Sequence, residues 1–357
     1  MTSPVDPLAV GQKMVAVLDD GRRTGTYKLA VAVALLDLAV ELAPADPDAK
    51  VPIDLDVLTV RVMEQYWGQL RPFEGQVLRQ SSDGRSVILK ALSNLRNAVA
   101  GHREIPLETA KLLAPDAYEF CVAAVKDNVV RYPLKLLQNV GTSARAEHFL
   151  YDEPWLDSAT KRSIREHGNQ IWLLPGVARS LSRLAPLLKP AFQLAWAQDV
   201  RGMNSFLADE PDVAQHLFGA DRVSLTRPAE VLAAAYGPQC FYCASRIRRD
   251  RQVDHVLPWS RVGLDGLTNL VLACASCNSN KSNYVPAPGL VERALGRGRE
   301  SLQELADGID WPSQYGRVES AARGIYVTIT TATPVWHERS RIEPLTRVDF
   351  VWPVDGR

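Results

Sequence analysis

Two Cys-x-x-Cys pairs are the residues of this chain whose types and spacing most clearly predict chemistry. Each pair bends the backbone so that both sulfurs face one point, and two pairs can complete a tetrahedral zinc shell. The four thiols belong to Cys240, Cys243, Cys274 and Cys277. A disulfide or redox pair is the alternative, but we expect no secretory signal and a cytoplasmic location, where thiols stay reduced. The spacing therefore predicts a closed, structural Zn²⁺ site.

An Asp-His pair lies in the segment between the two cysteine pairs. Asp254 and His255 are adjacent, so on an extended backbone their side chains point to opposite sides and can take different tasks. A carboxylate can bind a metal ion while an imidazole handles protons, although a lone histidine is more often an ordinary core or surface residue. The neighbours favour the chemical interpretation, because Asn269 precedes a short apolar strand and Asn278 follows the second cysteine pair.

Taken together, residues 237–284 resemble the HNH endonuclease family. Four features agree in order and separation: the first cysteine pair, Asp-His-x-x-Pro-x-Ser, Asn-Leu-x-x-x-Cys-x-x-Cys-Asn, and a lysine, Lys281, three residues further on. One signature position departs from the family pattern, since Asn278 stands where histidine is usual. This change makes the ligand set harder, with oxygen in place of nitrogen.

The resemblance implies metal-assisted hydrolysis of a phosphodiester bond. His255 would act as the general base toward the attacking water. Asp254 and Asn278 would hold a divalent cation that stabilises negative charge on the phosphate and the leaving oxygen. Oxygen ligands suit Mg²⁺ or Mn²⁺ better than zinc, so two metals with different roles are implied. Asn269 would complete the catalytic group by fixing the loop and orienting His255.

Basic residues beside the Asp-His pair are candidates for binding the nucleic-acid backbone. Guanidinium groups suit bidentate contacts with phosphate, while the alternative for any charge run is a solvated surface. We favour phosphate binding for the arginines, and for the lysine we weigh a phosphate contact and a solvated side chain equally. The candidates are Arg246, Arg248, Arg249, Arg251 and Lys281.

Outside this segment, composition and periodicity predict a mainly α-helical protein. The chain has 357 residues, 46% of them apolar and 23% charged, and its formal net charge is zero. Any nucleic-acid contact must therefore come from local patches. Apolar residues at three- and four-residue spacing predict an all-helical N-terminal domain, in which Tyr66 and Trp67 form either a nucleic-acid surface or, as we favour, an anchor for helix packing.

The expected domain organisation has five parts, with a small ββα-metal nuclease core and its four-cysteine zinc site in the second half. They are a loose lead-in at 1–25, a helical domain of unknown role (targeting, regulation or assembly) at 26–205, a connector at 206–236, the nuclease core at 237–286, and an extension covering the core at 287–357.

Local patterns predict particular elements within these parts. Helices are expected at 55–70, 86–100, 115–131, 175–204 and 289–307, core strands at 246–257 and 269–273, a core helix from near Asn278, and a further strand at 324–334. The apolar run at 27–43 contains Asp37 and Glu41 and is short for a membrane span, so we expect a buried helix and no membrane partner.

We therefore predict a divalent-metal-dependent HNH-type endonuclease that acts on DNA, with RNA not excluded as a substrate. One such site cuts one strand, so a double-strand break would need a homodimer, two sequential nicks or a partner protein. A helical domain joined to such a core suggests restriction or phage defence by analogy. Two alternatives stay open, a non-catalytic zinc-dependent nucleic-acid-binding protein and a helical interaction protein with a structural zinc clip. Metal-dependent cleavage would distinguish both from the nuclease.

Overall fold

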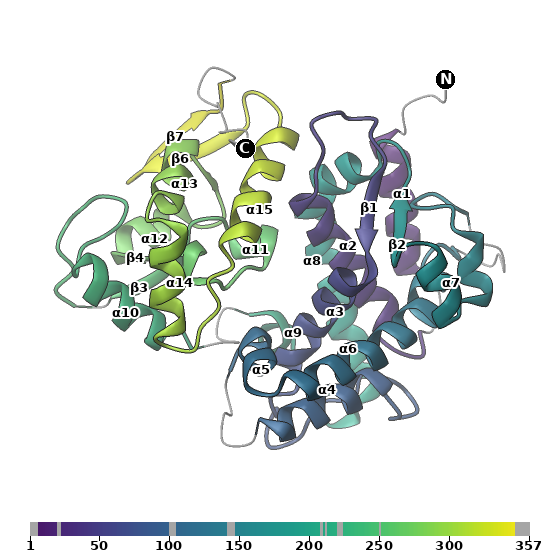
Figure 1. Ribbon diagram of the computed structural model, residues 1–357. Coiled ribbons are helices and arrows are strands. Elements are labelled where there is room, and N and C mark those ends of the chain that lie inside the picture. The colour runs from purple at the N-terminus through teal and green to yellow at the C-terminus, as the bar shows by residue number, and fades with distance from the viewer. Residues whose placement is uncertain are drawn as a thin grey trace. The chain divides into compact units, whose positions relative to one another are not determined.

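The computed structural model divides the chain into two compact units (Figure 1). It describes residues 6–19, 23–99, 105–140, 147–207, 210, 213–219, 224–249 and 251–346. The first unit comprises Met1–Ala39 and Pro44–Val223, and the second comprises Val40–Ala43 and Ser224–Arg357. The main division falls within the expected connector at 206–236. Parts of the expected lead-in (1–5 and 20–22) and of the expected extension (347–357) lie outside the described residues.

Helices build most of the first unit, as predicted. They are α1 (Pro7–Asp19), α2 (Tyr27–Glu41), α3 (Leu55–Gln69), α4 (Val87–Ala98), α5 (Leu107–Leu113), α6 (Pro115–Val129), α7 (Lys161–Glu166), α8 (Val177–Met203) and α9 (Val213–Phe218). Short 3-10 or π turns lie at 130–134, 154–158 and 205–207. Two strands, β1 (Val51–Asp54) and β2 (Gln170–Leu173), pair in antiparallel orientation, so this unit is mainly helical and not all-helical as expected.

The core of the first unit contains the aromatic residues that sequence left ambiguous. Tyr66 is fully buried, and its ring centroid lies 5.0 Å from that of Trp196 on α8. Its hydroxyl lies 2.7 Å from the hydroxyl of Thr26, which satisfies both buried groups. Trp67 is also buried, and its indole donates to the carbonyl of Ile105 at 2.7 Å. Both residues therefore anchor helix packing and do not form a nucleic-acid surface.

The expected loose lead-in is wrong for residues 7–19, which form α1. Val10, Met14 and Val17 follow helical spacing and are buried, because α1 packs along α8. Pro7 does not break the helix, since a proline in the first turn lacks only an N–H that would have no helical partner. The apolar run that follows forms the buried helix α2, as expected, and no helix in the described part of the chain is long and apolar enough to cross a membrane.

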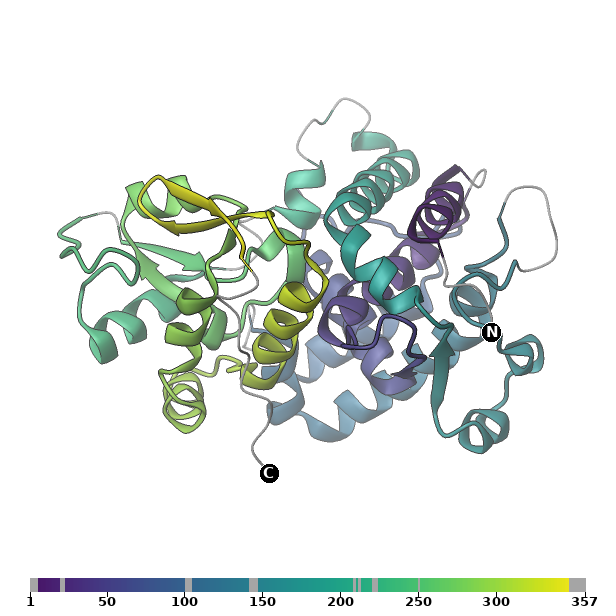
Figure 2. The same cartoon turned by 90° about the horizontal axis from the view of Figure 1, so that it is seen from above.

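The second unit surrounds a β-hairpin and a short helix with further helices. Its helices are α10 (Thr226–Tyr236), α11 (Trp259–Val262), α12 (Ala275–Lys281), α13 (Pro288–Leu295), α14 (Arg299–Asp307) and α15 (Tyr315–Thr328). Its strands are β3 (Gln252–His255), β4 (Leu270–Ala273), β5 (Val285–Pro286), β6 (Pro334–Glu338) and β7 (Arg341–Pro344). β5 pairs in parallel with β6, which pairs in antiparallel orientation with β7, the yellow hairpin of Figure 2.

The ββα arrangement consists of β3, β4 and α12. β3 and β4 are antiparallel, with Gln252 opposite Ala273 and His255 opposite Leu270. The first strand is shorter than predicted, because Arg246 instead forms an isolated bridge with Gln239. The helix begins at Ala275, earlier than predicted, since Cys274 already takes the extended conformation of an N-cap. The second cysteine pair therefore spans the start of α12.

Two further expectations for the second unit are wrong in detail. The predicted helix at 289–307 is two helices, α13 and α14, separated where Gly298 adopts a positive φ of 90°. The predicted strand at 324–334 begins instead as the last turns of α15, and β6 starts only at Pro334. Val318, Ala322 and Ile325 are buried at helical spacing, so packing of α15 outweighs the strand preference of its β-branched residues.

Candidate functional site

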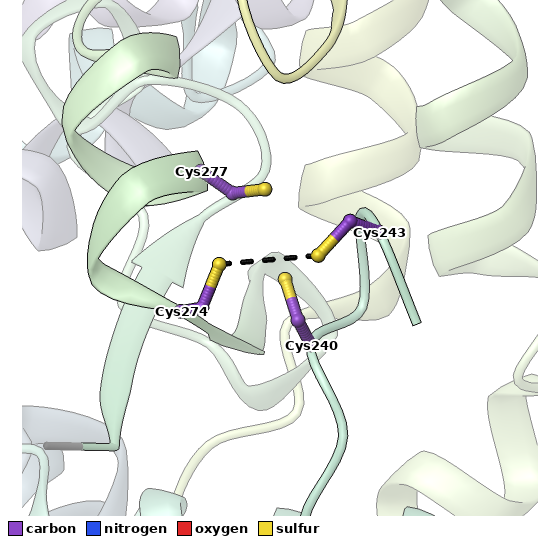
Figure 3. A group of neighbouring side chains, drawn as sticks. All are labelled: Cys240, Cys243, Cys274 and Cys277. Carbon is purple, nitrogen blue, oxygen red and sulfur yellow. Dashed lines mark hydrogen bonds between the residues drawn. The ribbon is translucent and has the colours of Figure 1, made fainter. Parts of the chain in front are cut away.

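The four cysteines converge in the second unit. Figure 3 shows Cys274 and Cys277 at the start of α12, facing Cys240 and Cys243 on the opposite loop. Their four Sγ atoms lie within 4.8 Å of one another, and those of Cys243 and Cys274 are 3.9 Å apart. A tetrahedral zinc ion with Zn–S bonds of about 2.3 Å holds its sulfurs about 3.8 Å apart. The cluster therefore fits a structural zinc ion.

The thiols of this cluster differ in their tendency to ionise. Burial opposes ionisation of Cys243, but hydrogen bonds from Ser245 and the neighbouring thiols outweigh it and lower the pKa of Cys243 to about 6. Burial raises the pKa of Cys240 and of Cys277. One thiolate thus forms readily near neutral pH, whereas the two buried thiols need the charge of a metal ion to ionise.

Asp254, on β3, is held by two buried side chains. The hydroxyl of Tyr242 donates to Asp254 Oδ2 at 2.6 Å, and Lys281 Nζ lies 3.0 Å from the same oxygen. Burial, together with the charge of Asp254, raises the pKa of Tyr242, so the phenol stays protonated and remains a donor. The ring of Tyr242 is fixed in turn by an edge contact with Trp336 of β6, at a centroid distance of 4.9 Å. The Asp254 carboxylate is therefore oriented through Oδ2.

Lys281 neither faces a phosphate site nor is solvated, so both of the alternatives expected for it are wrong. Its side chain is 0% exposed, and Nζ donates to the carbonyl of His255 at 2.7 Å in addition to its ion pair with Asp254. Burial lowers the pKa of Lys281, and the charge of Asp254 only partly opposes that shift. As the last residue of α12, Lys281 points back under β3 and supports both members of the Asp-His pair.

His255 ends β3 with a partly exposed imidazole, 15% of the side chain being accessible. Its Nε2 lies 2.7 Å from Oδ1 of Asp265, which belongs to the loop between α11 and the 3-10 turn at 267–269. Sequence analysis did not identify Asp265. The available signal was an acidic residue between two glycines, ten positions after His255, and nothing local indicated that this loop folds back onto the histidine.

Asn269 joins both ends of the segment that separates the two strands. Its Nδ2 donates to the carbonyls of Leu257 and Leu264, both at 3.0 Å, and its Oδ1 accepts from the backbone N–H of Leu257 at 2.8 Å. The side chain is fully buried, and these hydrogen bonds all go to the backbone. Asn269 therefore fixes the loop that directly follows His255, which is the contact that the sequence analysis expected of it.

Asn278 lies on α12, and its amide has a defined orientation. Nδ2 donates to Oε1 of Gln252 at 2.8 Å, so the Oδ1 atom of Asn278 is the one available as a metal ligand. Gln252 opens β3, the strand that also carries Asp254, and α12 packs against β3. Asp254 and Asn278 thus come from adjacent elements, each with one atom fixed by a hydrogen bond. Gln252 is a second supporting residue that sequence analysis missed.

The four candidate arginines all have exposed side chains. They lie in the irregular segment that leads into β3, and Ile247 between the first two is buried and anchors that segment. Exposure leaves the guanidinium groups accessible to a nucleic-acid backbone. The residues are Arg246, Arg248, Arg249 and Arg251.

Residues 240–287 match the family model of the HNH endonucleases. The matched segment contains the cysteine cluster, the Asp-His pair, Asn269 and Asn278, so the resemblance seen in the sequence is confirmed for this segment. A search of curated proteins and a search of solved structures returned no match.

Proposed function

We propose that the HNH segment makes this protein a divalent-metal-dependent endonuclease that hydrolyses phosphodiester bonds in DNA. The observation that carries the proposal is the pairing of a partly exposed imidazole, His255, with an adjacent buried carboxylate, Asp254, that two side chains hold in place. A zinc-binding module that only bound nucleic acid would not need this arrangement. The location of the Asp254–His255 pair inside the matched segment supports a catalytic role for the pair.

Asp254 and Asn278 are the residues that would hold Mg²⁺ or Mn²⁺. Tyr242 and Lys281 both contact Asp254 at Oδ2, so Oδ1 would face a cation, and Asn278 offers its amide Oδ1. Both are hard oxygen donors, as these cations prefer, and each is oriented by a hydrogen-bonded neighbour. When bound, the cation supplies positive charge that stabilises the phosphorane-like transition state and the leaving oxygen.

His255 would take a proton from the attacking water in its neutral form. A general base must be reachable by the water and fixed in direction, and the imidazole of His255 is both partly exposed and hydrogen-bonded. Its main chain is fixed as well, because its carbonyl accepts from Lys281. The arginines that lead into β3 would bind the backbone of the substrate and align the scissile phosphate.

The zinc ion would be structural in this scheme. It would join the loop carrying Cys240 and Cys243 to the start of α12, and thereby fix α12 relative to β3. We also propose a cytoplasmic location, where thiols stay reduced and can bind zinc. By analogy, we extend the proposal to restriction or phage defence, with double-strand cleavage by a homodimer, by a partner or by two sequential nicks.

Cleavage of supercoiled plasmid by the zinc-loaded full chain, with Mg²⁺ or Mn²⁺ added, tests the proposal. We expect wild-type protein to nick the plasmid, the His255→Ala variant to be inactive, and the His337→Ala variant to be active, because His337 lies on β6 beside Glu343. Single-stranded DNA and RNA substrates in parallel identify the preferred nucleic acid. DNA binding without metal-dependent cleavage would refute the nuclease and favour a zinc-dependent binding protein.

A further inference from the structure

The loop that carries Asp265 brings a carboxylate onto the imidazole of the proposed general base. The Nε2–Oδ1 distance of 2.7 Å is that of a charge-assisted hydrogen bond. An ionised carboxylate can only accept, so Nε2 must carry the proton in this contact. We propose that Asp265 is a positioning residue that fixes His255 as its Nε2–H tautomer and leaves Nδ1 as the nitrogen that accepts the proton of the attacking water. The inference rests on the proposed role of His255.

The backbone around Asp265 is fixed by a segment outside the matched residues. The indole of Trp311 donates to the carbonyl of Asp265 at 2.7 Å, and the N–H of Gly266 donates to Oε1 of Gln314 at 2.8 Å. The next N–H, that of Leu267, donates to the carbonyl of Pro312 at 2.8 Å. Residues 311–314 therefore hold the carbonyl of Asp265 and the residues that directly follow it, and we call them the clamp.

Gly266 shows how closely the clamp approaches this loop. A Cβ at this position would lie 2.4 Å from the Cβ of Gln314 and 2.6 Å from the carbonyl oxygen of Ser313. The backbone angles of Gly266 are open to other residues, with φ of −61°, so the requirement for glycine comes from space alone. Glycine here allows the loop to lie directly against the clamp.

Arg297 fixes the segment that follows. Its guanidinium donates to the carbonyl of Leu270 at 2.9 Å and to that of Thr268 at 2.5 Å. Burial lowers the pKa of Arg297 to about 10, so it remains charged at neutral pH. Asn269 holds the carbonyl of Leu264 just before Asp265, while the clamp and Arg297 hold the residues after it. A carboxylate on a loop fixed in this way loses little entropy when it orients an imidazole, which is what a positioning residue requires. A solvated surface aspartate would not need such support.

The tautomer of His255 can be measured in the absence of substrate and of the catalytic cation. We would record the ¹⁵N resonances of the imidazole rings in zinc-loaded full-length protein, and assign His255 with the His255→Ala variant. We expect a protonated Nε2 in the wild type. In Asp265→Asn, the amide can donate to Nε2 and so favours the opposite tautomer. The matched control is Asp307→Asn, an exposed aspartate on α14. An unchanged tautomer in Asp265→Asn would overturn the inference.

Single-turnover cleavage of a labelled DNA duplex supplies the second measurement. At a metal concentration that saturates the wild type, we expect Asp265→Asn and Asp265→Ala to lower the single-turnover rate about 10- to 100-fold, with an unchanged half-saturating DNA concentration and unchanged zinc content. A rate restored by a higher metal concentration would show instead that Asp265 is a cation ligand, and an unchanged rate would show that it is dispensable; either result overturns the inference. If the wild type does not cleave, the proposed function fails, while the tautomer still decides whether Asp265 positions His255.

Discussion

Replacing Lys281 with methionine tests whether the buried ion pair supports the site. The substitution keeps the length and apolar stem of the side chain but removes the ammonium that lies 3.0 Å from Asp254 Oδ2 and 2.7 Å from the carbonyl of His255. Asp254 would then be a buried carboxylate that still accepts a hydrogen bond from Tyr242 but has lost the charge of Lys281. The cost of that uncompensated charge, more than the loss of one contact, should dominate the change in stability.

The magnitude follows from burial and distance. Two unit charges 3.0 Å apart attract by about 5.5 kcal/mol at an effective dielectric constant of about 20. Desolvation offsets much of this attraction, as the lowered pKa of Lys281 indicates. Removing one partner of a buried pair typically costs about 3–5 kcal/mol, because the other charge is left in place. We expect Lys281→Met to lower the stability of the second unit by about 3 kcal/mol.

Native-state hydrogen exchange of the β3 and β4 amides measures this loss, because it reports the opening free energy of that hairpin separately from the first unit. A double-mutant cycle with Asp254→Asn should show a coupling of about 2 kcal/mol, since removing both charges leaves neither buried alone. Arg323→Met is the matched control, because it removes an exposed positive charge from α15. A loss below about 1 kcal/mol, or no coupling, would refute the reasoning.

Three further predictions concern other parts of the chain. Chelation of zinc, or Cys240→Ser, should expose the cluster thiols to iodoacetamide and reduce the hydrogen-exchange protection of β3 and β4. Cys121, which is 1% exposed, should stay unmodified. Mass spectrometry measures the thiol modification and the hydrogen exchange. Arg297→Met should destabilise the second unit by about 3 kcal/mol in hydrogen exchange, because buried carbonyls lose a charged donor. Burial raises the pKa of Cys121 from 9.0 to about 12. Between these two pH values the unfolded chain releases a proton that the folded chain keeps, so the first unit should lose stability as the pH rises from 9 to 12. Cys121→Ala should reduce this loss in urea titrations across that range.

The local part of the candidate site could be predicted from the sequence. Short-range spacing determines where the cysteine pairs, the Asp-His pair and Asn278 fall on a hairpin and the helix after it. Helical periodicity likewise predicted most helices of the first unit, because burial of one face leaves a three- to four-residue pattern. The expectations for α1 and α15 were wrong because the residues of these two segments have ambiguous local preferences. Tertiary packing determined that both segments form helices.

The supporting contacts could not be predicted, because they join residues far apart in sequence. Trp311 reaches Asp265 across 46 positions, and neither residue belongs to a recognisable spacing pattern. The burial of Lys281 depends on the fold of β3 above it, so a lysine after a cysteine pair was equally consistent with a solvated side chain. The type of a charged residue alone does not indicate whether its side chain faces the core or the solvent.

The clamp and Trp336 bear on how the proposed nuclease could be moved between proteins. The matched residues end at 287, but the contacts that hold Tyr242 and the Asp265 loop come from Arg297, residues 311–314 and β6. A graft of the matched residues alone into another protein would carry the reacting groups without their supports, and would leave Tyr242 facing solvent. The segment to transfer instead runs from Ser224 through β7, so gene fusions or natural recombination that keep the proposed activity should have junctions outside those limits.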